Sequence, residues 1–131
     1  MATVRKEIDV TASAEDAWDA VRDYGRLHER LVAGFATDCE LDGDDRLVTF
    51  FTGTVLRERL VSLDDERRRL AWSIVDGPYA HHNGVLDVLD RDGDGCRLVW
   101  TADLLPGEAA ERTSAMMEEG AQAMARTLVS A

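Results

Sequence analysis

The chain has 131 residues, 45% of them hydrophobic, and this length and composition favour one globular domain over residues 1–131 with its own core. Its 26 acidic and 15 basic side chains give a formal net charge of −11, which argues against nucleic acid and anionic membrane surfaces as partners. The sequence has no secretory leader and no run of about eighteen apolar residues. We therefore expect no membrane insertion and a cytoplasmic location.

Residues 6–25 predict a short edge strand followed by a helix. Ile8 and Val10 alternate with polar residues, which is the period of a half-buried strand. Ser13 is a suitable helix N-cap, and Tyr24-Gly25 ends the helical pattern. The predicted buried face of this helix consists of Ala14, Ala17, Trp18 and Val21. A second short helix is predicted over residues 26–31, so two short helices follow the first strand.

The middle of the chain has the period of strands, and its C-terminal part has the period of a helix. Six strands are predicted over residues 35–41, 46–53, 55–63, 69–75, 81–89 and 96–104. Short turns rich in Asp and Gly separate them, which predicts an antiparallel meander. From Glu108 a helix of about twenty residues, or ~30 Å, follows. Its predicted buried stripe is Ala109, Thr113, Met116, Met117, Gly120, Met124 and Leu128, mostly small or flexible side chains that favour space between the helix and the sheet.

The order of these elements resembles the START-like helix-grip superfamily, particularly its polyketide cyclase/dehydrase and lipid-transport branch. The segments that carry the resemblance are residues 8–10, 14–18, 23–25 with Leu27, 69–73 and 95–101. The resemblance implies an α+β helix-grip fold, in which a seven-stranded antiparallel curved sheet wraps around a long C-terminal helix. It also implies a cavity that holds an apolar ligand between the sheet and this helix.

Strand alternation predicts which side chains face the helix. With the C-terminal strand as the anchor, the inward residues are Leu98, Trp100, Ala102, Leu104, Leu70, Trp72, Ile74, His82, Leu86, Val88, Leu56, Glu58 and Leu60, with Phe50 beside them. We expect the ligand-binding residues to be Tyr24, His28, Phe50, Glu58, Trp72, His82, Trp100, Met116, Met117 and Met124, with Tyr24 and His28 at the cavity mouth.

Glu58 and His82 are the candidate catalytic residues, because a buried carboxylate near an imidazole is able to transfer protons. A structural alternative is that Glu58 pairs with an arginine and His82 is a core histidine with satisfied hydrogen bonds. Trp72 and Trp100 fit either core packing or a ligand platform. A bulge in the strand that holds Glu58 would turn Arg57 and Arg59 inward instead and give an anion-binding cavity.

Two motifs that suggest metal binding fail on geometry, so no metal and no cofactor is expected. Residues 90–95 resemble the start of a calcium-binding EF-hand loop, but its last position is Thr101 where a glutamate is needed. His81 and His82 are adjacent on a strand and point to opposite faces.

Three functional interpretations remain after this survey. The first is a protein that binds a small hydrophobic molecule of the lipid, polyketide or isoprenoid type. The second is an enzyme resembling polyketide cyclases and aromatases, in which Glu58 or His82 removes a proton. The third is a partner-binding domain that uses the outer face of the sheet. The sequence leaves monomer and homodimer both open.

Overall fold

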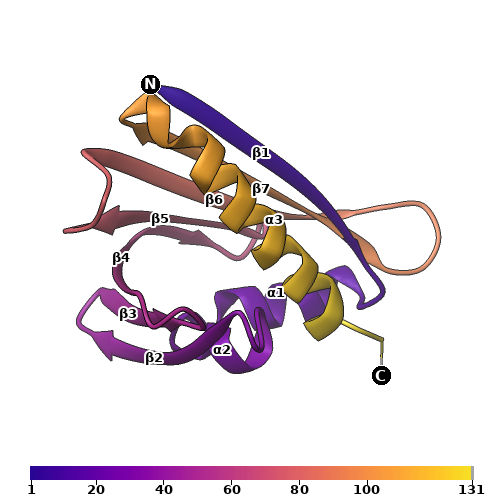
Figure 1. Ribbon diagram of the computed structural model, residues 1–131. Coiled ribbons are helices and arrows are strands. Elements are labelled where there is room, and N and C mark those ends of the chain that lie inside the picture. The colour runs from indigo at the N-terminus through magenta and orange to yellow at the C-terminus, as the bar shows by residue number, and fades with distance from the viewer. Residues whose placement is uncertain (131) are drawn as a thin grey trace.

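The computed structural model describes residues 1–130, which form a curved antiparallel sheet with one long helix against it (Figure 1). The strands are β1 (Ala2–Val10), β2 (Ala36–Asp42), β3 (Asp45–Phe50), β4 (Val55–Asp64), β5 (Arg69–Val75), β6 (His81–Asp90) and β7 (Cys96–Leu105). The helical segments are α1 (Ala14–Arg22), η1 (Tyr24–Arg26), α2 (Leu27–Arg30), η2 (Gly107–Ala109) and α3 (Ala110–Thr127). None of the helices within residues 1–130 is long and apolar enough to cross a membrane.

The strand order in the sheet is β1-β7-β6-β5-β4-β3-β2, so strands β2 to β7 form a meander and β1 closes the sheet beside β7. Every neighbouring pair is antiparallel, as short turns between consecutive strands require. The predicted seven-stranded α+β helix-grip fold is confirmed, with short helices after β1 and a long helix at the C-terminus.

β1 is longer than the strand predicted from residue 6. It pairs with β7 along its whole length, from Ala2 opposite Leu104 to Val10 opposite Cys96. Lys6 stands between Val4 and Ile8 in the inward alternation and interrupts the apolar pattern. The Lys6 Nζ lies 3.4 Å from a carboxylate oxygen of Glu118 on α3, so Lys6 forms an ion pair with the helix.

α1 is capped and packed as its sequence predicts. The hydroxyl of Ser13 accepts a hydrogen bond from the backbone N–H of Asp16 at 3.1 Å, which satisfies one of the free donors at the helix start. Trp18 is buried on the core face, and its indole N–H donates to Asp65 at 2.9 Å. The second predicted helix is shorter than expected, because a turn of 3₁₀ helix precedes the four residues of α2.

α3 lies beside β1 in Figure 1, at one end of the curved sheet. At the C-terminal end of α3, the carbonyl of Leu128 accepts a hydrogen bond from the Ala12 N–H at 3.2 Å. The predicted buried stripe is confirmed, with Thr113, Met117, Gly120 and Met124 buried. A Cβ atom on Gly120 would come within 2.8 Å of the Trp100 ring, so only glycine lets this tryptophan fit beneath the helix.

Candidate functional site

A cavity of about 390 Å³ lies between the concave face of the sheet and α3. Its apolar lining consists of Leu27, Leu31, Val32, Phe35, Phe50, Leu56, Leu70, Trp72, Ile74, Leu86, Trp100, Met116, Met117 and Met124. The volume falls within the roughly 300–1,000 Å³ that is usual for small-molecule sites. A lining of mostly aromatic and aliphatic side chains is also typical of such sites. The interior next to α3 is therefore not solidly filled.

Most residues that the sequence suggested for ligand contact line this cavity. They are Phe50, Glu58, Trp72, His82, Trp100, Met116, Met117 and Met124. Tyr24 and His28 do not line it, which corrects their placement at the mouth. The strand residues could be placed because a period of two fixes their face. Tyr24 and His28 come from short helical segments, in which no such period defines a face.

Arg46 and Glu58 form a buried ion pair on the cavity wall. Arg46 Nε donates to Glu58 Oε1 at 2.9 Å, and Arg46 Nη2 lies 2.8 Å from the same oxygen. Their side chains are only 3% and 8% exposed, and the two residues face each other across β3 and β4. The pairing of Glu58 with an arginine is the structural alternative considered from the sequence.

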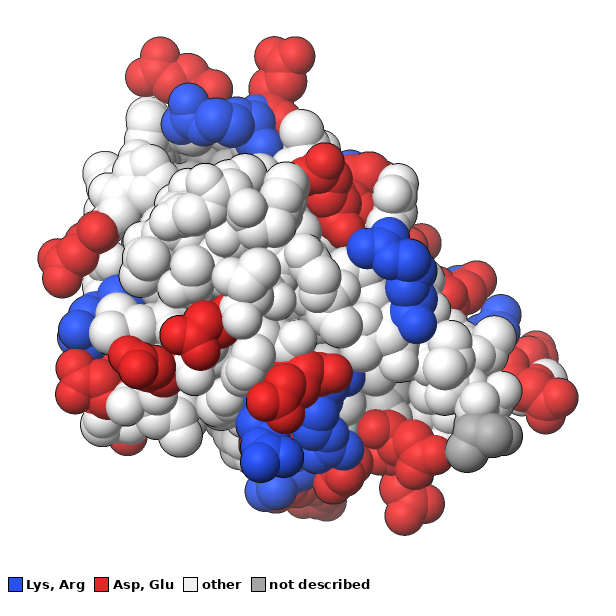
Figure 2. Space-filling model, turned by 60° about the horizontal axis from the view of Figure 1, so that its bottom comes forward, with Lys and Arg blue, Asp and Glu red and all other residues white. Residues whose placement is uncertain are grey.

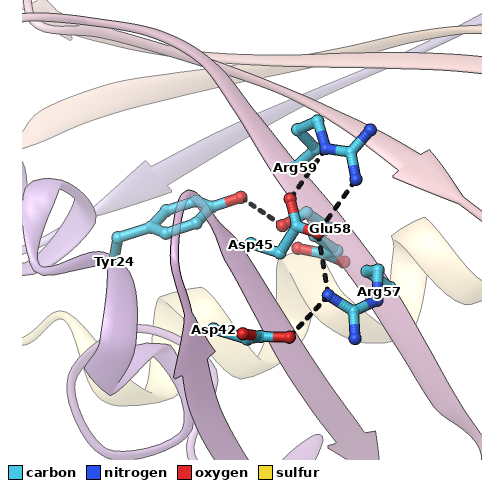
Figure 3. Close-up of polar contacts among 6 residues, drawn as sticks. All are labelled: Tyr24, Asp42, Asp45, Arg57, Glu58 and Arg59. Atoms are coloured by element: carbon cyan, nitrogen blue, oxygen red, sulfur yellow. Dashed lines mark hydrogen bonds and ion pairs between the residues drawn. The ribbon is translucent and has the colours of Figure 1, made fainter.

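Tyr24 lies behind this ion pair and supports it. Its hydroxyl donates to the backbone carbonyl of Glu58 at 2.9 Å (Figure 3), and its own carbonyl accepts from Arg46 Nη1 at 3.1 Å. The Arg46 guanidinium also lies 3.9 Å from the centre of the Tyr24 ring, within the range of a cation–π contact. Burial raises the pKa of the Tyr24 hydroxyl well above its usual value, so the hydroxyl remains a neutral donor.

His28 is directed toward its neighbour on α2 and not toward the cavity. Its Nε2 lies 3.3 Å from a carboxylate oxygen of Glu29, and its Nδ1 is buried without a hydrogen-bond partner among the described residues. The His28 side chain therefore contributes to the packing around α2.

His82 is a buried, neutral imidazole. Its Nδ1 accepts a hydrogen bond from the backbone N–H of Ile74 at 3.2 Å, and its ring packs against Tyr79 with the two ring centres 5.2 Å apart. Because Nδ1 is the acceptor, the proton of the neutral ring is on Nε2. Burial lowers the pKa of His82 to about 4, with the neighbouring His81 charge as a smaller cause.

Glu58 and His82 both line the cavity but do not contact each other. Glu58 is opposite Ile74 in the pairing of β4 with β5, and Ile74 in turn donates to the His82 ring on β6. One strand therefore separates them, and two strand spacings amount to roughly 10 Å. Ile74 also lines the cavity, so an apolar side chain stands between the two polar ones.

Arg57 and Arg59 face away from the cavity, on the outer surface of the sheet. Figure 3 shows both of them around Asp45, to which Arg57 Nη1 and Arg59 Nε each donate at 2.8 Å. These hydrogen bonds, that of Arg59 above all, lower the pKa of Asp45 to about 2. The bulge in β4 falls between Leu60 and Ser62, beyond these residues, so the anion-binding alternative with both arginines inside is wrong.

Exposed residues surround the opening of the cavity. They are Phe51, Thr52 and Thr54 in the turn after β3, Pro78 before β6, and Arg112 and Glu119 on α3. Phe51 is 53% exposed and its ring centre lies 5.9 Å from that of Phe35. On the face that Figure 2 presents, a broad area carries no charged side chains and is bordered by acidic and basic ones.

Sequence reasoning missed Arg46, which supplies the cation of the buried pair. Arg46, Val48 and Phe50 alternate along β3 and are all buried, so the same period of two that placed Glu58 contains the signal. Tyr79 and Phe35 were also missed. Tyr79 lies outside the strands, where no alternation defines a face, and Phe35, which the sequence placed in the strand over residues 35–41, lies in the turn before β2.

Comparison of the sequence with models of protein families gives one match over nearly the whole chain. The family is described as polyketide cyclase/dehydrase and lipid transport, and its model matches residues 1–129. Among curated protein sequences, none matches at a significant level.

Solved structures share the fold over most of their length. XoxI from Bacillus cereus has a TM-score of 0.87 at 19% identity, covering 98% of this chain and 96% of that one. A protein from Thermobifida fusca is 32% identical, with a TM-score of 0.75 and coverage of 96% and 89%. A START superfamily protein from Mycobacterium smegmatis has a TM-score of 0.78 at 15% identity and covers 96% of each chain.

Proposed function

Because the chain belongs to the polyketide cyclase/dehydrase and lipid transport family, we propose that its cavity binds a small hydrophobic ligand of the lipid, polyketide or isoprenoid type. The observation that carries this proposal is the largely apolar cavity of about 390 Å³ between the sheet and α3. The proposed contacts are the cavity-lining residues Phe50, Glu58, Trp72, His82, Trp100, Met116, Met117 and Met124.

The size of the cavity supports binding over incomplete packing. Protein interiors are close-packed, and voids larger than a water molecule are few. A cavity of about 390 Å³ leaves its apolar lining without packing partners or in contact with water, and both are unfavourable. A bound apolar molecule removes this cost, so the residues that keep the space open fit a binding role.

The hydrogen bonds of Glu58 and His82 favour binding over proton abstraction. Glu58 forms a buried ion pair with Arg46 through Oε1, and the only nitrogen of neutral His82 that could accept a proton is bonded to the Ile74 N–H. A general base needs a free acceptor within reach of the substrate proton, which His82 does not offer and which Glu58 offers only at Oε2, beside the charge of Arg46. We therefore assign both residues to ligand anchoring, and cyclase chemistry is the second outcome of the test below.

The test is a search for the ligand followed by a binding measurement. Native mass spectrometry of protein purified from its own host should reveal a co-purified small molecule. Titration with Nile red, an uncharged apolar dye, should give saturable fluorescence with one site per chain. At one hundred times its Kd, the dye should stabilise the fold by about 2.7 kcal/mol.

The absence of both a co-purified molecule and saturable dye binding would overturn the proposal. The enzymatic alternative would be supported if the protein converted an added linear poly-ketone to a cyclised product. His82→Gln should then lose this conversion while its affinity for Nile red stays unchanged.

A further inference from the structure

Two polar atoms that are open to the cavity have unused hydrogen-bonding capacity, in addition to the Trp100 indole N–H, which has no partner among the described residues either but is fully buried. The hydrogen bond from Arg46 Nε and the close approach of Arg46 Nη2 both involve Glu58 Oε1, and Oε2 has no hydrogen-bond partner among residues 1–130. On His82, Nδ1 is occupied by the Ile74 N–H, while the Nε2–H has no partner in the same range. Both atoms remain accessible and are not sealed in the core, although Glu58 and His82 are only 6% and 5% exposed.

These two atoms differ in chemical character. A carboxylate oxygen only accepts hydrogen bonds, whereas the Nε2–H of a neutral imidazole donates one. The cavity therefore offers an acceptor on β4 and a donor on β6, with the apolar side chain of Ile74 between them on β5. Since neighbouring strands are about 4.8 Å apart, the backbones of the two strands that carry these anchors are separated by roughly 10 Å.

The polar groups of the cavity interior carry no net charge. The positive charge of Arg46 compensates Glu58 at 2.8 Å, and His82 is neutral. An anionic head group buried here would have the Glu58 carboxylate as a neighbour and no uncompensated cation within the described interior wall. Burying an unpaired charge is strongly unfavourable, so the interior disfavours an anionic head group, and Arg112, the other arginine that lines the cavity, is exposed at its opening.

On the ligand-binding function proposed above, we propose that the cavity selects an uncharged hydroxyketone with a rigid apolar body. Its hydroxyl group donates to Glu58 Oε2, and its carbonyl oxygen, at the opposite end of the rigid body, accepts from His82 Nε2. The apolar rings lie across Ile74. This ligand class satisfies both unused atoms without burying a new charge.

Steroids of matched shape test this specificity in the intact protein. Testosterone has a hydroxyl at one end of a rigid ring system and a ketone at the other, androstenedione has ketones at both ends, and androstane has neither group. We expect displacement of Nile red by testosterone to be roughly tenfold stronger than by androstenedione, since a hydrogen bond to a charged acceptor is lost. Androstane should bind more weakly than either, and palmitate should be the weakest competitor.

The variant His82→Phe tests the donor end. It should reduce the affinity for testosterone roughly tenfold more than the affinity for androstane, because only testosterone has a carbonyl that accepts from His82. If this variant does not fold, the four-ligand series on the unaltered protein still decides the question.

The outcomes separate this inference from the proposed function. Equal affinity for the three steroids, or tighter binding of palmitate, would overturn the hydroxyketone specificity while the dye result keeps hydrophobic binding intact. Failure of Nile red and of every steroid to bind would overturn both.

Discussion

At the scale of single residues, the Arg46–Glu58 pair is the strongest constraint on the cavity wall. Both side chains are more than nine-tenths buried, so each charge depends on the other for compensation. We predict that Glu58→Leu destabilises the fold by about 3–5 kcal/mol, because it leaves Arg46 buried and unpaired. The double variant Arg46→Leu/Glu58→Leu should be more stable than this single variant. Urea unfolding of the two single variants and the double variant measures the coupling, and strictly additive effects would contradict the prediction.

His82 should make stability depend on pH in the mildly acidic range. Its pKa is about 4 in the folded protein and about 6.5 in the unfolded chain, so the unfolded state binds more protons between these values. The contribution of neutral His82 to the free energy of unfolding is therefore complete above pH 6.5 and is lost as the pH falls toward 4. From pH 7 to pH 5 the loss should be about 2 kcal/mol.

The variant His82→Gln isolates this contribution from the many carboxylates. Glutamine does not titrate, and its amide oxygen is able to accept the Ile74 hydrogen bond in place of Nδ1. Urea unfolding at both pH values should show a smaller loss of stability in the variant than in the unaltered protein. Equal losses in the two proteins would refute a role for His82 protonation.

The placement of cavity residues could be predicted only where a strand or the long helix defined one face. Alternation placed Glu58, Trp72 and His82 on the inner face, and the structure has them there. It did not reveal what Glu58 bonds to, because the partner Arg46 comes from the neighbouring strand and depends on the register between β3 and β4. Residues of short helices, such as Tyr24, are oriented by tertiary contacts that no local period encodes.

At the scale of elements, two glycines make room for the tryptophans of the cavity. A Cβ on Gly84 of β6 would come within 2.8 Å of the Trp72 ring, and one on Gly120 of α3 would come equally close to Trp100. The two indole rings lie 6.4 Å apart and tilted. The packing of α3 against the sheet thus depends on the absence of a side chain at Gly120.

We predict that Gly120→Ala destabilises the protein by about 1–2 kcal/mol, although alanine is the better helix former. The added methyl group would contact the outer ring atoms of Trp100, so shortening that side chain should relieve the strain. In a Trp100→Phe background the same substitution should be neutral or stabilising by up to about 1 kcal/mol. Urea unfolding in both backgrounds tests this, and an equal effect in each would show that Trp100 is not the cause.

The elements themselves could be predicted more fully than their ends. Turn residues and the change from period two to period 3.6 located every strand and the long helix. The first half of β1 was missed because Lys6 breaks its apolar pattern, although backbone pairing with β7 continues through it. The bulge between Leu60 and Ser62 was also not located, since the sequence left open where the register shifts.

At the scale of the whole molecule, the cavity follows from where α3 packs. The helix lies beside β1, held there by Lys6 and by the contact of Leu128 with Ala12, while the sheet curves away toward β3. The methionines on α3 do not reach across the remaining space, which leaves about 390 Å³ between helix and sheet. Stability and binding should then oppose each other, because filling this space strengthens the core and excludes a ligand.

Filling the cavity from α3 tests this opposition. Met116 is half-buried and lines the cavity, so Met116→Phe should add apolar volume inside and stabilise the fold by about 0.5–2 kcal/mol. Its affinity for Nile red should fall at least tenfold, a loss of about 1.4 kcal/mol or more in binding free energy. Ala115 is exposed on the same helix, and Ala115→Phe is the matched control that should leave dye affinity unchanged. Thermal unfolding and dye titration of both variants measure the two effects. Unchanged dye affinity in Met116→Phe would mean that the dye binds elsewhere on the protein.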